Sequence, residues 1–98
     1  MNLIGISINH RTSSIELREA VHLSTDEQKD FIKLLRNDVL KEGFVISTCN
    51  RTEIFGIPKT NSVGNKALFE KLINFKNVDG LSLDNIEKYE SEDALNHI

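Results

Sequence analysis

The chain has 98 residues, which is enough for one small domain with a single hydrophobic core. Apolar residues make up 39% of the sequence and charged residues 28%, the balance of an ordinary globular domain. The net charge of −3 argues against a general nucleic-acid-binding protein, although a local patch could still contact an RNA.

The chain opens with a predicted strand and a short helix. Leu3 to Ile8 alternates apolar with small residues, which is typical of a strand. Ser13 and Glu16 have the spacing of a capping box, in which two side chains satisfy free amides at the start of a helix. This predicts a short helix over about residues 14–21.

A second capping box predicts a longer helix directly afterwards. Ser24 and Glu27 form this box. Apolar residues follow it at helical spacing: Phe31, Ile32, Leu35 and Val39. Gly43 is a natural helix terminator, so the helix is expected to stop before it.

The middle of the chain predicts a β-hairpin. Phe44 to Ile46 is rich in aromatic and β-branched residues, and so is the segment from Thr52 to Ile57. The polar stretch between them reads as the turn, and Pro58 is expected to end the second strand.

The remaining third predicts a helix, an edge strand and the start of a further helix. The helix is expected over about residues 64–75, and Asp79-Gly80 then marks a turn. Residues 86–89 are short and polar at their ends, as in an edge strand. Ser91 precedes two acidic residues, which predicts a helix that is truncated where the sequence ends at Ile98.

The order of these elements defines the expected fold class. When the first short helix is set aside, the pattern is βαββαβ, which favours a ferredoxin-like sandwich. We therefore expect an α+β domain with an antiparallel sheet and helices packed on one face.

Cys49 is the main candidate for chemistry. It lies where an apolar strand meets a polar turn, and a nearby guanidinium such as Arg51 would favour the thiolate. Arg51 follows two positions later and could share a face with it, or could bind a substrate carboxylate. The alternative is a small buried core residue, because free cysteines are often buried.

The other residue types limit the possible sites. The lone cysteine excludes a disulfide within the chain and favours a reducing, cytoplasmic compartment. Neither a signal peptide nor an apolar run of membrane-spanning length is present. His10, His22 and His97 are scattered, so no metal site is predicted. No glycine-rich phosphate loop occurs, so a nucleotide cofactor must bind mainly elsewhere.

Three segments resemble the glutamyl-tRNA reductase family. They are Gly5-Ile6-Ser7-Ile8-Asn9-His10-Arg11-Thr12-Ser13 with Ile15-Glu16-Leu17-Arg18-Glu19, then Ile46-Ser47-Thr48-Cys49-Asn50-Arg51-Thr52-Glu53-Ile54, and then Ala94-Leu95-Asn96-His97. The second is similar to the family's active-site motif almost residue for residue. The stretch from Pro58 to Asp84 matches only in pattern.

The resemblance implies a reaction and its residues. The family uses NADPH to reduce glutamyl-tRNA(Glu) to glutamate-1-semialdehyde, the first step of tetrapyrrole (5-aminolevulinate) synthesis. Cys49 would attack the aminoacyl ester and form a thioester. Thr48, Asn50 and Arg51 match substrate-binding positions, and Arg51 would hold the glutamate carboxylate. His97 matches an activity-linked histidine with an acid–base or positioning role.

The resemblance also implies what surrounds this chain. Residues 1–98 would be the catalytic, substrate-binding domain, cut short at its C-terminal end and without the family's NADPH-binding and dimerisation domains. The full-length protein would be a homodimer, with glutamate-1-semialdehyde aminomutase as a candidate channelling partner. The fragment alone would be a monomer and at most a slow esterase.

Two other readings stay open at this point. One is a ferredoxin-like binding module with a structural cysteine, although the predicted strands show no ladder of aromatics for stacking bases. The other is a thiol hydrolase or acyltransferase that uses Cys49 and a histidine.

Overall fold

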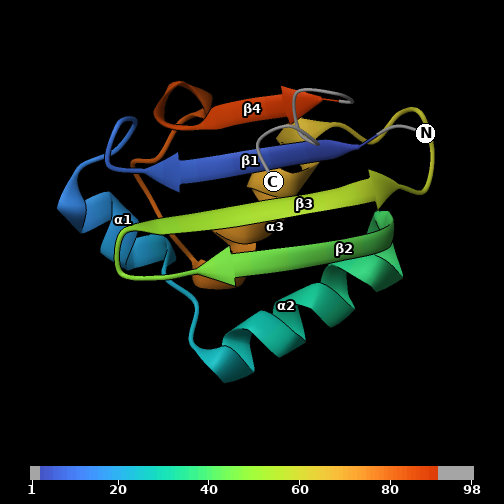
Figure 1. Ribbon diagram of the computed structural model, residues 1–98, viewed down its shortest axis with the longest axis horizontal. Helices are drawn as coiled ribbons and strands as arrows, with labels where there is room; N and C mark the ends of the chain where they lie inside the picture. The colour runs from blue at the N-terminus through green and yellow to red at the C-terminus, as the bar shows by residue number, and fades with distance from the viewer. Residues whose placement is uncertain (1–2, 91–98) are drawn as a thin grey trace.

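The computed structural model describes residues 3–90 (Figure 1). Its elements, in chain order, are β1 (Ile4–Asn9), α1 (Ile15–Val21), α2 (Thr25–Asp38), β2 (Leu40–Ser47), β3 (Arg51–Pro58), α3 (Asn65–Lys76), a 3₁₀ turn η1 (Leu83–Asn85) and β4 (Glu87–Glu90). The strands form one antiparallel sheet in the order β2-β3-β1-β4. This confirms the α+β class, the hairpin and the edge position of the last strand.

The helices cover one face of this sheet and build the core there. Figure 1 shows α3 behind the sheet and α2 along the β2 side. Alternate residues of β1 enter the core together with residues from both longer helices: Ile4, Ile6, Ile8, Phe31, Leu35, Leu68 and Leu72. The rings of Phe31 and Phe75 lie 5.0 Å apart and join α2 to α3. The periodic apolar residues predicted both helices because this face buries them.

The opposite face carries a row of aromatic rings around a glycine. Gly5 pairs with Phe55 on one side and Tyr89 on the other. The Phe55 ring lies 5.4 Å from that of Phe44 and 6.0 Å from that of Tyr89. A Cβ on Gly5 would lie 2.2 Å from a Phe55 ring carbon, so only glycine leaves room for this ring.

The first helix is capped by a different serine from the one predicted. The Ser14 hydroxyl, not that of Ser13, accepts the Leu17 amide at 3.3 Å. Ser13 instead donates its hydroxyl to the Asn85 carbonyl at 2.8 Å, which ties this loop to η1. The second capping box is confirmed, with Ser24 and Glu27 satisfying each other's amides.

The boundary between α2 and β2 also differs from the prediction. The helix ends at Asp38, and Gly43 lies inside β2 instead of terminating the helix. Leu40 is fully buried, and its side chain occupies the space beside Gly43 and Gly56, which pair with each other. The two glycines serve this packing, which a reading of local propensity misses.

The last helix within the described residues, α3, lies close to its prediction. It ends at Lys76, and Asn77 then adopts the left-handed conformation (φ 54°) typical of a helix end. The predicted helix after Ser91 falls outside the described residues.

Candidate functional site

The segment from Thr48 to Arg51 forms the tip of the β2–β3 hairpin. The Thr48 amide donates to the Arg51 carbonyl at 2.8 Å, so Cys49 and Asn50 form a two-residue loop. The Thr48 hydroxyl accepts the amides of Asn50 at 3.2 Å and Arg51 at 3.3 Å. Neither loop residue has positive φ, so a side chain stabilises this turn in place of the usual glycine. The loop therefore presents Cys49 in a defined position.

The connection between α1 and α2 is bonded to the base of this hairpin. The Ser47 hydroxyl accepts the Leu23 amide at 2.9 Å and lies 2.9 Å from the Thr52 hydroxyl. Thr52 in turn lies 3.4 Å from the Val21 carbonyl. These bonds hold residues 21–23 beside the cysteine-bearing loop. The two segments are distant in sequence, since His22 and Thr48 are 26 residues apart.

The His22 side chain also contacts the hairpin. Its Nδ1 lies 3.1 Å from the Thr48 carbonyl oxygen and 3.2 Å from the Ser47 hydroxyl. The histidine also ends α1, where its backbone amide donates to the Glu19 carbonyl. Neither the spacing nor the composition of the sequence pointed to this residue.

Two hollows flank the hairpin tip. One, of about 470 Å³, is lined by His10, Thr48, Asn50 and Arg51. The other, of about 460 Å³, is lined by Ile15, Glu19, His22, Cys49 and Asn50. Asn50 borders both hollows, with Cys49 on one side and Arg51 on the other. A ligand that contacts both Cys49 and Arg51 would therefore also pass over Asn50.

Cys49 is exposed, so the reading of it as a buried structural residue is wrong. That finding contradicts only the buried cysteine of the binding-module reading. The expectation that the strands carry no ladder of aromatics is also wrong, because Phe44, Phe55 and Tyr89 form a row across the sheet. Exposure is what a nucleophile requires, because a thiolate must reach its substrate.

Arg51 stays partly available for a ligand. Its side chain is 53% exposed, and its Nε lies 3.7 Å from a carboxylate oxygen of Glu53, which is almost buried. At that distance the pair is an ion pair without a short hydrogen bond. Cys49 and Arg51 were expected to share one face of the hairpin, but they line two neighbouring hollows. The predicted site residue His97 lies outside the described residues.

A charged network fixes the β1–β4 edge near the row that pairs Asn9 with Arg51. Glu87 accepts from Asn9 at 2.8 Å, from Arg11 at 2.8 Å and from the Tyr89 hydroxyl at 2.6 Å. Burial alone would raise the pKa of Glu87, but these hydrogen bonds lower it below its usual value. Burial and the bond to Glu87 raise the pKa of Tyr89. The network holds the edge strand in place.

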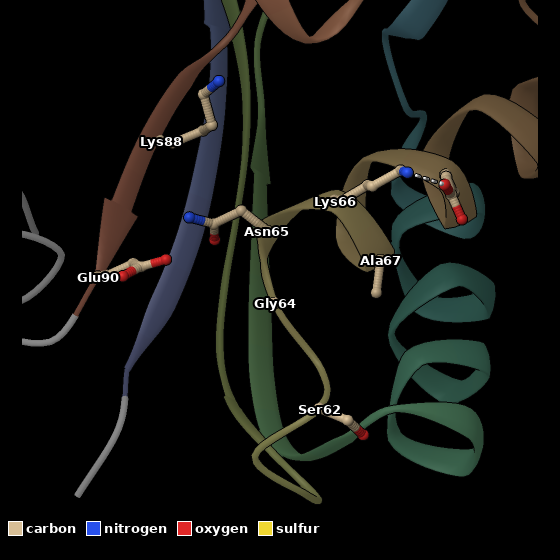
Figure 2. A pocket seen from close by; sticks show the side chains of 8 residues that line it. Ser62, Gly64, Asn65, Lys66, Ala67, Lys88 and Glu90 are labelled. Carbon is tan, nitrogen blue, oxygen red and sulfur yellow. Dashed lines mark ion pairs between the residues drawn. The ribbon is translucent and has the colours of Figure 1, made fainter.

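A larger hollow of about 740 Å³ lies at the start of α3, away from the cysteine (Figure 2). Lys66 is paired there with Glu70 at 3.9 Å. The buried Asn65 amide accepts from the Gly5 backbone at 3.0 Å and donates to the Tyr89 carbonyl at 3.2 Å. The Asn65 side chain therefore uses its hydrogen bonds to join α3 to β1 and β4, and we assign this hollow a structural role.

Other kinds of site find no support in the part of the chain that the structure describes. Residues 3–90 contain no group of three or more His, Cys, Asp or Glu side chains that could hold a metal ion. None of the described helices combines the length and apolar character needed to cross a membrane.

Comparison with known proteins identifies relatives of this chain. Residues 6–98 match the family model described as the N-terminal domain of glutamyl-tRNA(Glu) reductase. The chain is 43% identical over 77 residues to the glutamyl-tRNA reductases of Pelodictyon phaeoclathratiforme and Chlorobium limicola, covering 78% of this chain and 18% of each relative. It is 37% identical over 101 aligned positions to that of Aliarcobacter butzleri, covering 100% of this chain and 23% of the relative. The chain thus spans about a fifth of the length of these relatives.

Proposed function

This chain belongs to the family of glutamyl-tRNA reductase N-terminal domains, and on that premise we propose that Cys49 accepts the glutamyl group of glutamyl-tRNA(Glu) as a thioester. This is the acyl-transfer step of the NADPH-dependent route to glutamate-1-semialdehyde and tetrapyrroles. The observation that carries the proposal is the exposed thiol at the tip of a hydrogen-bonded hairpin, in a hollow that adjoins the Arg51 hollow at Asn50.

The chemistry of the step suits a thiol. The sulfur attacks the ester carbonyl while the thiol gives up its proton. A carbon–sulfur bond forms, the carbon–oxygen bond to the terminal ribose breaks, and the ribose oxygen leaves with a proton. The aminoacyl ester is already activated, so one displacement yields the thioester without another reactant.

The neighbouring residues would orient the substrate. We assign Arg51 to the side-chain carboxylate of glutamate, because a guanidinium binds a carboxylate through two parallel hydrogen bonds. The hollow that Arg51 shares with His10 has the charge to receive it. Asn50 borders both hollows, which supports assigning it to the bond between the acyl group and the ribose. Thr48 acts by shaping the loop, and His97 is retained as a proposed acid–base residue.

NADPH does not fit the fold of the residues that the structure describes. A dinucleotide site uses a parallel sheet and a glycine-rich turn before a helix. The described sheet is antiparallel, and Gly64 before α3 is not part of a G-x-G-x-x-G sequence. We therefore derive no reduction step for these residues and assign hydride transfer to parts of the longer relatives.

The proposal also covers the fold class, the location and the partners. The ferredoxin-like class is supported by two helical crossovers, from β1 to β2 and from β3 to β4, within a four-stranded antiparallel sheet. A cytoplasmic location is supported by the lone free thiol. Homodimers of the full-length protein, a monomeric fragment and channelling to glutamate-1-semialdehyde aminomutase follow from the family only.

The test is mass spectrometry of the chain after incubation with glutamyl-tRNA. The wild-type chain should gain a glutamyl group at Cys49, whereas Cys49→Ser should gain none, because an alkoxide is far harder to form than a thiolate near pH 7. Cys49→Ala provides the blank for non-specific acylation. A glutamyl adduct of equal yield in Cys49→Ala would reject Cys49 as the nucleophile.

A further inference from the structure

We propose that His22 is a second catalytic residue of the acyl transfer, moving the proton from the Cys49 thiol to the departing ribose oxygen through its Nε2. The proposal rests on the proposed function, because it requires Cys49 to be the nucleophile. Three features of the described residues carry it: the fixed tautomer of the imidazole, its free nitrogen and the hollow that it shares with the thiol.

The hydrogen bonds around His22 decide which nitrogen carries the proton. A carbonyl oxygen can only accept, so the Nδ1 atom that lies 3.1 Å from the Thr48 carbonyl must be the donor. The Ser47 hydroxyl, 3.2 Å away, can accept from the same Nδ1–H because its own proton is available for Thr52. In a neutral ring with Nδ1 protonated, Nε2 is the basic nitrogen.

That basic nitrogen is left available. Within residues 3–90 every hydrogen bond found for the His22 ring is made by Nδ1. The side chain is exposed, so Nε2 is not lost to the core. The backbone bond of Nδ1 orients the ring in the same way that an acceptor orients the base of other nucleophile–base pairs.

The shared hollow brings His22 and Cys49 to one place. Both residues line the same hollow of about 460 Å³, together with Ile15 and Glu19 from α1. His10 lines the other hollow with Arg51 and is not placed beside the thiol in this way. Ile15 is 55% exposed and offers an apolar surface for a base or ribose. The charged Arg51 hollow would then receive the glutamyl side chain, and the His22 hollow would receive the leaving terminal nucleoside.

The proposed step transfers a single proton from the thiol to the ribose oxygen. Nε2 takes the proton of the thiol as sulfur attacks the ester carbonyl. The resulting imidazolium gives the same proton to the ribose oxygen as the carbon–oxygen bond breaks, so the ring ends neutral. No further reactant is needed. General acid–base catalysis of this kind contributes roughly 10²–10⁴-fold to a rate.

The experiment compares two glutamyl donors that differ in their leaving group. Ribose oxygen in glutamyl-tRNA needs a proton to leave, whereas 4-nitrophenolate in glutamate α-4-nitrophenyl ester does not. The acylation rate of Cys49 is measured by mass spectrometry in the wild-type chain and in His22→Asn. Asparagine can keep an N–H near the position of Nδ1 while removing Nε2. We expect about a 100-fold loss with glutamyl-tRNA and a clearly smaller loss with the nitrophenyl ester.

Controls separate catalysis from folding and from the proposed function. His22→Gln serves as a second variant should His22→Asn unfold, and circular dichroism checks both. His10→Asn, in the other hollow, should affect the two donors equally. Equal losses with the two donors in the folded His22 variants would overturn the role of His22 alone. Failure of the wild-type chain to be acylated by either donor would overturn the proposed function as well.

Discussion

Arg51 owes its proposed role to its geometry as well as its charge. Its half-exposed guanidinium pairs with Glu53 at 3.7 Å, too far for a short hydrogen bond, so it can turn to a ligand. Lysine would keep the charge but lose the planar pair of donors. We expect Arg51→Lys to lower kcat/KM for acylation by glutamyl-tRNA about tenfold, as loss of a charged hydrogen bond costs roughly 1.5–3 kcal/mol.

Arg36→Lys is the matched control for that variant. Arg36 is 55% exposed and pairs with Glu42 at 3.8 Å, far from the hairpin tip in the chain. Acylation by Arg36→Lys should match that of the wild-type chain. An unchanged kcat/KM in Arg51→Lys would mean that another group binds the glutamate carboxylate.

Gly5 allows a test of the packing on the second face of the sheet. Gly5→Ala would place a Cβ 2.2 Å from a Phe55 ring carbon, so the ring must move. Overpacking of this kind costs about 1–3 kcal/mol in the free energy of unfolding. Urea unfolding should show this loss, and the loss should shrink when the substitution is made in a Phe55→Leu background. A Gly5→Ala penalty that is the same in both backgrounds would show that the ring is not the obstacle.

At the scale of single residues, the sequence pointed to Cys49 and its neighbours but not to their arrangement. The motif around Cys49 is local, so it could be read directly. His22 and the division into two hollows depend on bonds between segments about 25 residues apart, such as that between Leu23 and Ser47. The choice between Ser13 and Ser14 as the cap likewise depends on Asn85, distant in sequence.

Helix α2 is anchored at its start by a capping box and an ion pair. Glu27 bonds the Ser24 amide and lies 2.8 Å from Lys76 at the end of α3. The bond from Lys76 is the largest cause that lowers the pKa of Glu27 from 4.5 to about 2. Because the folded-state pKa is the lower one, this stabilisation is fully present above pH 4.5 and is lost as the pH falls toward 2.

Removing Lys76 should therefore destabilise the fold fully above pH 4.5 and progressively less as the pH falls toward 2. Lys76→Met should unfold at lower urea concentration than the wild-type chain at pH 6, and the difference should vanish near pH 2. Lys66→Met removes the more exposed partner of a 3.9 Å pair and should change little at either pH. A difference between wild type and Lys76→Met that persists undiminished at pH 2 would contradict the assignment to this ion pair.

The elements themselves were largely predictable because their signals are local. Capping boxes and helical spacing marked α2, and β-branched residues marked the hairpin. The prediction that Gly43 terminates the helix was wrong because it considered Gly43 alone. In the fold, Gly43 pairs with Gly56 of the neighbouring strand, and the Leu40 side chain fills the space beside both glycines. Glycine reads as a terminator by propensity, and only the packing shows that it is needed inside the strand.

For the whole molecule, the proposed division of labour predicts an incomplete reaction. The described residues include the proposed nucleophile Cys49 but no glycine-rich nucleotide-binding turn, so water is the remaining acceptor of a thioester formed on Cys49. The chain should slowly release glutamate from glutamyl-tRNA and form no semialdehyde, whether or not NADPH is present. Assays of both products with and without NADPH measure this. Semialdehyde formed at the rate of the longer relatives would place the cofactor site within these 98 residues.

The central place of β1 has a consequence for synthesis on the ribosome. This strand is synthesised before both of its partners, β3 and β4, and β4 ends at Glu90. Until that residue has left the exit tunnel, one edge of β1 has no partner and its apolar side chains lack part of their cover. The hairpin and α2 can form earlier, because their contacts are close in sequence. A nascent chain stalled just before β4 emerges should therefore remain sensitive to protease and become resistant only when β4 is outside.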